Sequence, residues 1–209
     1  MPHTVRIWDL PTRLFHWSLA VTTVALVVTA KLGGNAMQWH LRLGYVMLAL
    51  LAFRLAWGLV GGRWSRFASF LPTPARLRSH FANQEGKVTS PGHSPLGALS
   101  VFALLAVLLA QVGTGLLSDD EIAFAGPLTR FVSGEWVSQA TWYHKDVGQF
   151  LLLGLVALPL AAIVFYALVR RQALVGAMVH GDRQLPGATP ASRDDALSRA
   201  GAALVAALS

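Results

Sequence analysis

Four apolar runs, each about as long as a lipid bilayer is thick, dominate this sequence. A helix rises about 1.5 Å per residue, so about 20 apolar residues cross the roughly 30 Å of hydrocarbon in a membrane. Lipid offers the backbone no hydrogen-bond partners, and each run is therefore expected to form a helix. The runs predict an all-α fold, an integral membrane four-helix bundle, with spans at about residues 15–32, 41–60, 96–117 and 147–169.

The composition excludes several other classes of protein. Hydrophobic residues make up 54% of the 209 residues and charged residues only 13%, which leaves too little polar surface for a soluble globule of this size. No cysteine is present, so disulfides, thiolate metal sites, iron–sulfur clusters and covalent c-type haem attachment are excluded. Any metal is then held by His, Met or oxygen ligands. The first run lacks a small-residue cleavage site followed by a soluble domain, and we interpret it as a retained span.

The basic residues predict the topology. The formal charge is +7, but the Lys and Arg residues flank the apolar runs and form no basic stripe, so no nucleic-acid partner is expected. Cytoplasmic segments carry an excess of Lys and Arg, which places the N-terminus, the link after the second run and the tail in the cytoplasm. Twelve of the seventeen basic residues lie in those three segments: Arg6, Arg13, Arg63, Arg66, Arg76, Arg78, Lys87, Arg170, Arg171, Arg183, Arg193 and Arg199.

Both termini are thus expected to be cytoplasmic. We assign residues 1–185 to the four-span domain and residues 186–209 to an Ala-rich cytoplasmic tail. Residues 191–208 are too short and too charged for a fifth span, and they either form an amphipathic surface helix or stay disordered.

Three histidines lie at the ends of the apolar runs. His40 opens the second run and His144 just precedes the fourth, so both are expected at the outer face, whereas His16 opens the first run at the inner face. Two neutral imidazoles facing each other at one depth of a bundle are what a six-coordinate low-spin haem requires. We therefore predict that His40 and His144 bind haem iron; the alternative is that each is a hydrogen-bonded residue of the interfacial belt. His16 needs a partner on the inner half of another helix, and the fourth run offers none.

Charged residues near these histidines are candidates for contacts with the cofactor. Arg42 and Lys145 adjoin the predicted ligand pair and can meet haem propionates, or they extend to the membrane surface as ordinary interfacial residues. Arg54 lies inside the second run and needs an anion such as a propionate or a quinone-site carboxylate, unless it snorkels to the inner surface. His93 precedes the third run and either reaches a second iron or has a capping or loop role.

Several stretches resemble the bacterial cytochrome b(561) family, which includes hydrogenase-type cytochrome b subunits. They are residues 5–17, 40–44, 54–58, 92–97, 114–115 and 177–181, in order and with family-like spacing. The resemblance implies a four-helix protein of the bacterial inner membrane that passes electrons between the quinone pool and a partner on the outer side. It also implies b haems, commonly two, with His40 and His144 as the outer ligands and His16 as one inner ligand.

One position departs from that family pattern. The fourth helix usually carries a second histidine, and the matching position here is Pro159. Proline offers no ligand, so the inner haem is absent, five-coordinate on His16, or held by a substitute such as His93. We predict one tightly bound haem b per chain.

The leading functional prediction is an electron carrier, and quinone oxidoreductase activity is left open. Its expected partners are membrane lipid, quinone, and a periplasmic c-type cytochrome or other redox protein; homodimerisation is also left open. One alternative is a haem-bearing membrane anchor subunit of a hydrogenase or multihaem dehydrogenase. A second alternative is a small transporter with a protonatable histidine path, but the sequence lacks the paired broken helices or intramembrane carboxylates that such folds favour.

Overall fold

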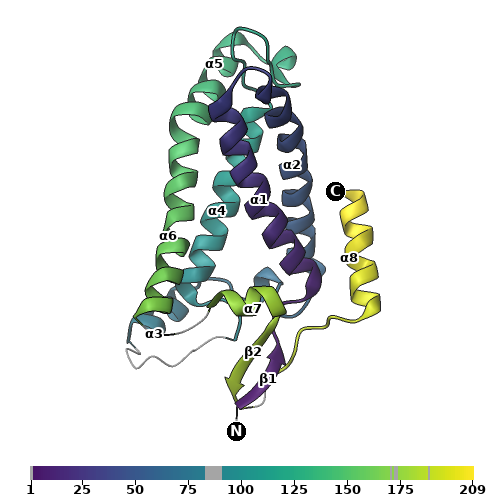
Figure 1. Ribbon diagram of the computed structural model, residues 1–209, viewed down its shortest axis with the longest axis vertical. Helices are drawn as coiled ribbons and strands as arrows, with labels where there is room; N and C mark the ends of the chain where they lie inside the picture. Colours follow the sequence, from purple (N-terminus) through teal and green to yellow (C-terminus); the bar gives the residue numbers. More distant parts are fainter. Residues whose placement is uncertain (1, 83–90, 170, 172–173, 188) are drawn as a thin grey trace. The chain divides into compact units, whose positions relative to one another are not determined.

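The structure is a computed structural model that describes every residue except 1, 83–90, 170, 172–173 and 188 (Figure 1). Lys87 and Arg170, which entered the topology prediction, lie outside the described residues. The chain divides into two compact units, which are described separately. Unit 1 comprises Met1–His16, Ala52–Phe102 and Leu158–Ser209, and unit 2 comprises Trp17–Leu51 and Ala103–Ala157. Each of the four long helices contributes one stretch to each unit.

Four helices are long and apolar enough to cross a membrane, as the sequence predicts. The fourth is a continuous rod over Gly134–Leu168, although its apolar run begins only near residue 147. An apolar run marks the part of a helix that suits hydrocarbon, and a helix can continue into the polar residues beside it. The helices are α1 (Leu10–Leu32), α2 (Ala36–Val60), α4 (Pro95–Gly115), and the rod formed by α5 (Gly134–Trp142), the π-helical turn η3 (Tyr143–Gly148) and α6 (Gln149–Leu168).

Pro159 lies inside α6, which continues past it to Leu168. Proline has no backbone N–H, so the carbonyl of Leu155 loses its usual helical partner at this point. The residue therefore weakens α6 locally and supplies no metal-binding side chain.

Unit 1 contains a small antiparallel sheet that the sequence did not predict. Strand β1 (Pro2–Arg6) pairs with β2 (Asp182–Pro186), with Arg6 opposite Asp182 (Figure 1). The N–H groups of Ile7 and Trp8 donate to the carbonyl of Gly181, which has a φ of +87°. A glycine takes up that left-handed conformation without the steric cost of a Cβ. The chain can therefore turn directly from α7 (Leu174–His180) into β2.

Short helices complete unit 1. They are η1 (Phe67–Ser69), α3 (Pro74–Ala82), α7 and the C-terminal helix α8 (Ala196–Leu208). Asp195 caps α8, because its carboxylate accepts a hydrogen bond from the Ser198 N–H at 2.8 Å. Of the two alternatives for the tail, the structure contains the helix.

Candidate haem site

His40 and His144 face each other in unit 2. Their ring centroids are 6.0 Å apart and their planes are nearly perpendicular, at 88°. An imidazole nitrogen binds a metal at about 2 Å, so two imidazoles on opposite sides of one ion bring their centroids to about 6 Å. An edge-to-face aromatic pair has a similar spacing. The hydrogen bonds of the two rings show which ring nitrogen is free in each.

Each ring contacts a backbone carbonyl through Nδ1. His40 Nδ1 lies 3.0 Å from the Leu26 oxygen of α1, and His144 Nδ1 lies 2.8 Å from the Gln111 oxygen of α4. A carbonyl only accepts hydrogen bonds, so each Nδ1 must carry the proton and donate. A neutral ring protonated at Nδ1 keeps its lone pair on Nε2, which is the form that binds iron. Two such rings have the free nitrogens that the axial ligands of a haem need, and the same carbonyl bonds also suit the alternative of hydrogen-bonded residues in the interfacial belt.

The π-helical turn η3 contains His144. A π turn widens the helix by one residue and leaves a backbone carbonyl without its normal partner, and such turns are frequent at functional sites. The His144 carbonyl, which lies in this turn, accepts from Gln111 Nε2 at 2.8 Å. Gln111 thus holds His144 twice, through its backbone oxygen at the ring and through its side chain at the carbonyl.

Two glycines allow this close packing. A Cβ on Gly148 would collide with the Gln111 side-chain oxygen, and a Cβ on Gly115 would lie 2.9 Å from His144 Cε1. Side chains at these two positions would displace the His144 imidazole or the Gln111 side chain. A Cβ on Gly44, one turn after His40, would meet no atom within 4 Å among the described residues.

The basic residues beside the pair are exposed. The Arg42 guanidinium lies over the Trp39 ring, 5.0 Å from its centroid. Lys145 is exposed as well, and its charge is among the causes that lower the pKa of Asp120. The main causes of that lower pKa are hydrogen bonds from the Phe124, Ala123 and Ile122 N–H groups to the carboxylate.

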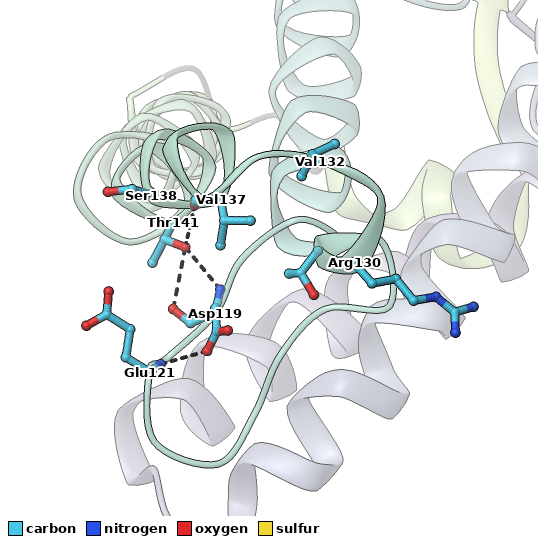
Figure 2. Close-up of a pocket in the computed structure, with 9 residues that line it drawn as sticks. Asp119, Glu121, Arg130, Val132, Val137, Ser138 and Thr141 are labelled. Atoms are coloured by element: carbon cyan, nitrogen blue, oxygen red, sulfur yellow. Dashed lines mark hydrogen bonds between the residues drawn. The ribbon is translucent and has the colours of Figure 1, made fainter.

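The loop that contains Asp120 is fastened to the rod three residues before His144. The Asp119 N–H donates to Thr141 Oγ1 at 3.0 Å, and that hydroxyl donates to the Val137 carbonyl at 2.8 Å. Figure 2 shows these bonds at the wall of a shallow pocket, with the Arg130 guanidinium pointing away from Asp119 and Glu121. The acidic loop is therefore held in a fixed position near the histidine pair.

Unit 1 holds Arg54 in a different environment. Arg54 is 4% exposed, donates from Nη1 to the Ser65 carbonyl at 3.1 Å and lies 4.5 Å from the Phe67 ring centroid. Among the described residues it forms no ion pair with a carboxylate. The nearby Asp9 carboxylate accepts instead from Ser65 Oγ at 2.7 Å and from the Thr12 N–H at 2.8 Å. Arg54 is a buried cation whose guanidinium can donate further hydrogen bonds to an anion.

His93, also in unit 1, lies in an aromatic cage. Its ring centroid is 4.7 Å from that of Trp8 and 4.2 Å from that of Phe70. Its Nδ1 is buried and has no hydrogen-bond partner among the described residues. Burial, together with the positive charges of Arg54 and His16, lowers the pKa of His93 to about 3, so the ring is neutral.

The helix-capping role that was one alternative for His93 is performed by the next residue, Ser94. Ser94 Oγ accepts from the Gly97 N–H at 3.1 Å, which caps the start of α4. His16 lies on α1, in the same unit as His93.

The comparison with known proteins agrees with these features. The model of the prokaryotic cytochrome b561 family matches residues 7–181. The chain belongs to that family. The cytochrome is 24% identical to a "Probable Ni/Fe-hydrogenase B-type cytochrome subunit" of Bradyrhizobium diazoefficiens, over 87% of this chain and 86% of the relative. It is 26% identical to proteins of the same name from Azotobacter vinelandii, over 89% and 91%, and from Rhodobacter capsulatus, over 86% and 81%. No solved structure matches.

Family membership settles the broad class of the cytochrome. It is a multi-pass integral membrane protein that carries haem b and takes part in electron transport.

Sequence reasoning missed two parts of the site of this cytochrome, Gln111 and the π turn. Gln111 is a polar amide inside the most apolar part of the third run, between Ala110 and Val112, and that contrast was a usable signal. The π turn has no comparable signature in the sequence.

Proposed function

We propose that this cytochrome transfers electrons between the quinone pool and a periplasmic redox protein through one haem b ligated by His40 and His144. The observation that carries the proposal is the pair of facing rings, each with its Nδ1 hydrogen bonded to a carbonyl. Haem b, when bound, supplies one-electron oxidation and reduction. The protein supplies the axial ligands, their orientation and the surrounding charge.

Each residue has a proposed task. His40 and His144 present Nε2 to the iron, and Gln111 fixes the orientation of His144. Arg42 and Lys145 meet the haem propionates, because both are exposed cations beside a ligand. Carbonyl acceptors at Nδ1 raise the electron donation of an imidazole to its metal.

We propose that His16 holds no second six-coordinate haem. Pro159 provides no imidazole, and the candidates that stay open for His16 are no haem, a five-coordinate haem, or a pairing with His93. Arg54 is proposed to meet an anion, either a propionate or a carboxylate of a quinone site. With both termini in the cytoplasm and residues 186–209 as a tail, a single outer haem favours a quinone site in the outer half of the membrane.

A second candidate function rests on the names of the relatives. Each is named a probable Ni/Fe-hydrogenase B-type cytochrome subunit, so this chain is a candidate for a haem-bearing anchor subunit that receives electrons within a membrane complex. In that case the redox partner is another subunit of the complex, and the cytochrome has no independent turnover.

Reduction kinetics of purified cytochrome in vesicles distinguish the two functions. In the first, added quinol reduces the haem, and a soluble c-type cytochrome outside the vesicles then reoxidises it. In the second, neither reagent exchanges electrons with the haem at a useful rate, and reduction requires co-purified hydrogenase subunits with hydrogen gas. The reduced-minus-oxidised absorption spectrum reports both reactions.

A further inference from the structure

The C-terminal helix α8 exposes an unusually apolar face. Of its 13 residues only Arg199 is charged. Leu197, Leu204 and Leu208 share one face and are 69%, 63% and 80% exposed, whereas Ala202 on the opposite face is 5% exposed. An apolar helix of this length is too short to span a membrane. The exposed leucines show that the described residues of this chain do not cover that face.

The base of α8 is fastened to the start of α1. The Asp194 carboxylate accepts from the Leu10 N–H at 3.2 Å and from Arg6 at 2.7 Å. Two residues before Asp194, the Ser192 N–H donates to the Arg6 carbonyl at 2.7 Å. Leu10 is the first residue of the membrane helix α1. The base of α8 is therefore attached to the start of a helix that is a candidate membrane span.

Charge is confined to that base. Arg199 pairs with Asp194 at 3.0 Å, and Arg193 pairs with Asp195 at 2.7 Å. Hydrogen bonds from Arg199, Leu10 and Arg6 outweigh the effect of burial and hold the pKa of Asp194 below its usual value, so the carboxylate stays ionised. Residues 200–209 carry no charged side chain. A helix with charges at one end and none beyond it suits entry into hydrocarbon.

We propose that α8 inserts its Leu197, Leu204 and Leu208 face among the lipid acyl chains of the leaflet in which α1 begins. The cluster of Arg6, Asp194 and Arg199 stays at the surface as its fixed base. Lipid is the favoured occupant because the base of α8 is attached to the start of the candidate membrane span α1, and because apolar side chains leave water most readily where hydrocarbon is adjacent. This inference concerns the tail alone and does not depend on the haem ligands or the redox partner.

Site-directed spin labelling tests the proposal on the full chain with its haem bound. The chain contains no cysteine, so single-cysteine variants carry one label each. The test variants are Leu204→Cys and Leu208→Cys, and the control is Ala191→Cys, an exposed position before the charged cluster. Each is reconstituted in vesicles of phosphatidylethanolamine and phosphatidylglycerol. Collisions of the label are measured with oxygen, which concentrates in lipid, and with a water-soluble nickel chelate.

We expect the labels at positions 204 and 208 to collide several-fold more with oxygen and several-fold less with the nickel chelate than the label at position 191. Chelate access equal to that at 191 overturns the proposal, since it places the face in water. Low access to both reagents also overturns it, since it places the face against protein, such as a second copy of the chain. If Leu204→Cys fails to assemble, as judged by its haem spectrum, Leu208→Cys near the free end carries the test.

Discussion

The two units of this cytochrome use histidine in opposite ways. In unit 2, His40 and His144 each donate from Nδ1 to a carbonyl and face each other at 6.0 Å. In unit 1, His93 lies between Trp8 and Phe70, and its Nδ1 has no partner among the described residues. The surroundings of the imidazoles therefore differ between the units: each ring of the pair in unit 2 has a carbonyl at Nδ1 and a second imidazole opposite it, whereas His93 has aromatic neighbours.

Alanine at His40 or His144 tests this comparison most severely. Either change leaves the iron with one imidazole, so we expect nearly all low-spin b-type absorbance to be lost. His16→Ala is the matched control in unit 1 and should keep that signal. The reduced-minus-oxidised spectrum of each purified variant gives the answer, and a full low-spin signal in both His40→Ala and His144→Ala would falsify the ligand assignment.

The second prediction concerns the number of haems. Unit 1 has Pro159 where an opposing imidazole is needed, so a pyridine haemochrome assay should give one haem per chain. Pro159→His should raise the content toward two, and Pro159→Ala, which restores the backbone N–H without a ligand, should leave it at one. Two haems in the unmodified protein contradict the prediction and direct attention to a His16 and His93 pairing.

The third prediction concerns the pH dependence of folding stability, which His93 of unit 1 is expected to influence. Folding holds the pKa of His93 at about 3, whereas the unfolded chain takes up a proton on this residue below about pH 6.5. The contribution of His93 to stability is therefore complete above about pH 6.5 and falls as the pH drops toward 3, with a loss of about 2 kcal/mol between pH 7 and 5. His93→Phe keeps the aromatic contacts and should remove most of that loss.

Thermal unfolding of both proteins in detergent at pH 7 and pH 5 measures the difference. An equal decrease in the melting temperature of the two proteins contradicts the burial of a neutral His93. The haem spectrum at each pH serves as the control for unit 2.

The smallest expected effect is at Gln111. Gln111→Leu removes the side-chain bond to the His144 carbonyl and keeps the backbone acceptor at Nδ1, so we expect haem affinity to fall about tenfold, with low-spin ligation retained. Gln139→Leu, on the exposed surface of α5, is the control. The rate of haem transfer to apomyoglobin measures the affinity. An unchanged rate in Gln111→Leu would show that the Gln111 side chain does not help to hold His144 in place.

Much of the fold could be predicted from the sequence, because spans depend on local composition. Long apolar runs without charge force helices in lipid, and the four runs correspond to four helices. The facing of His40 and His144 was also predictable, since both lie at run ends on the same predicted side of the membrane. The sheet of β1 and β2 was not predictable, because its partners lie at opposite ends of the chain and contain no strong alternating pattern.

Residue types and their order along the chain are enough to predict the class of this protein: a membrane bundle without cysteine, with histidines at the ends of its spans. Those properties follow from residue type and position along one chain segment. Folding is needed for the carbonyl bond that selects the protonated nitrogen of His144, for the contact between Gln111 and His144, and for the attachment of the base of α8 to α1. Each of these depends on atoms far apart in sequence, Gln111 with His144 and Asp194 with Leu10, and a hydrogen bond exists only once folding brings both partners within about 3 Å.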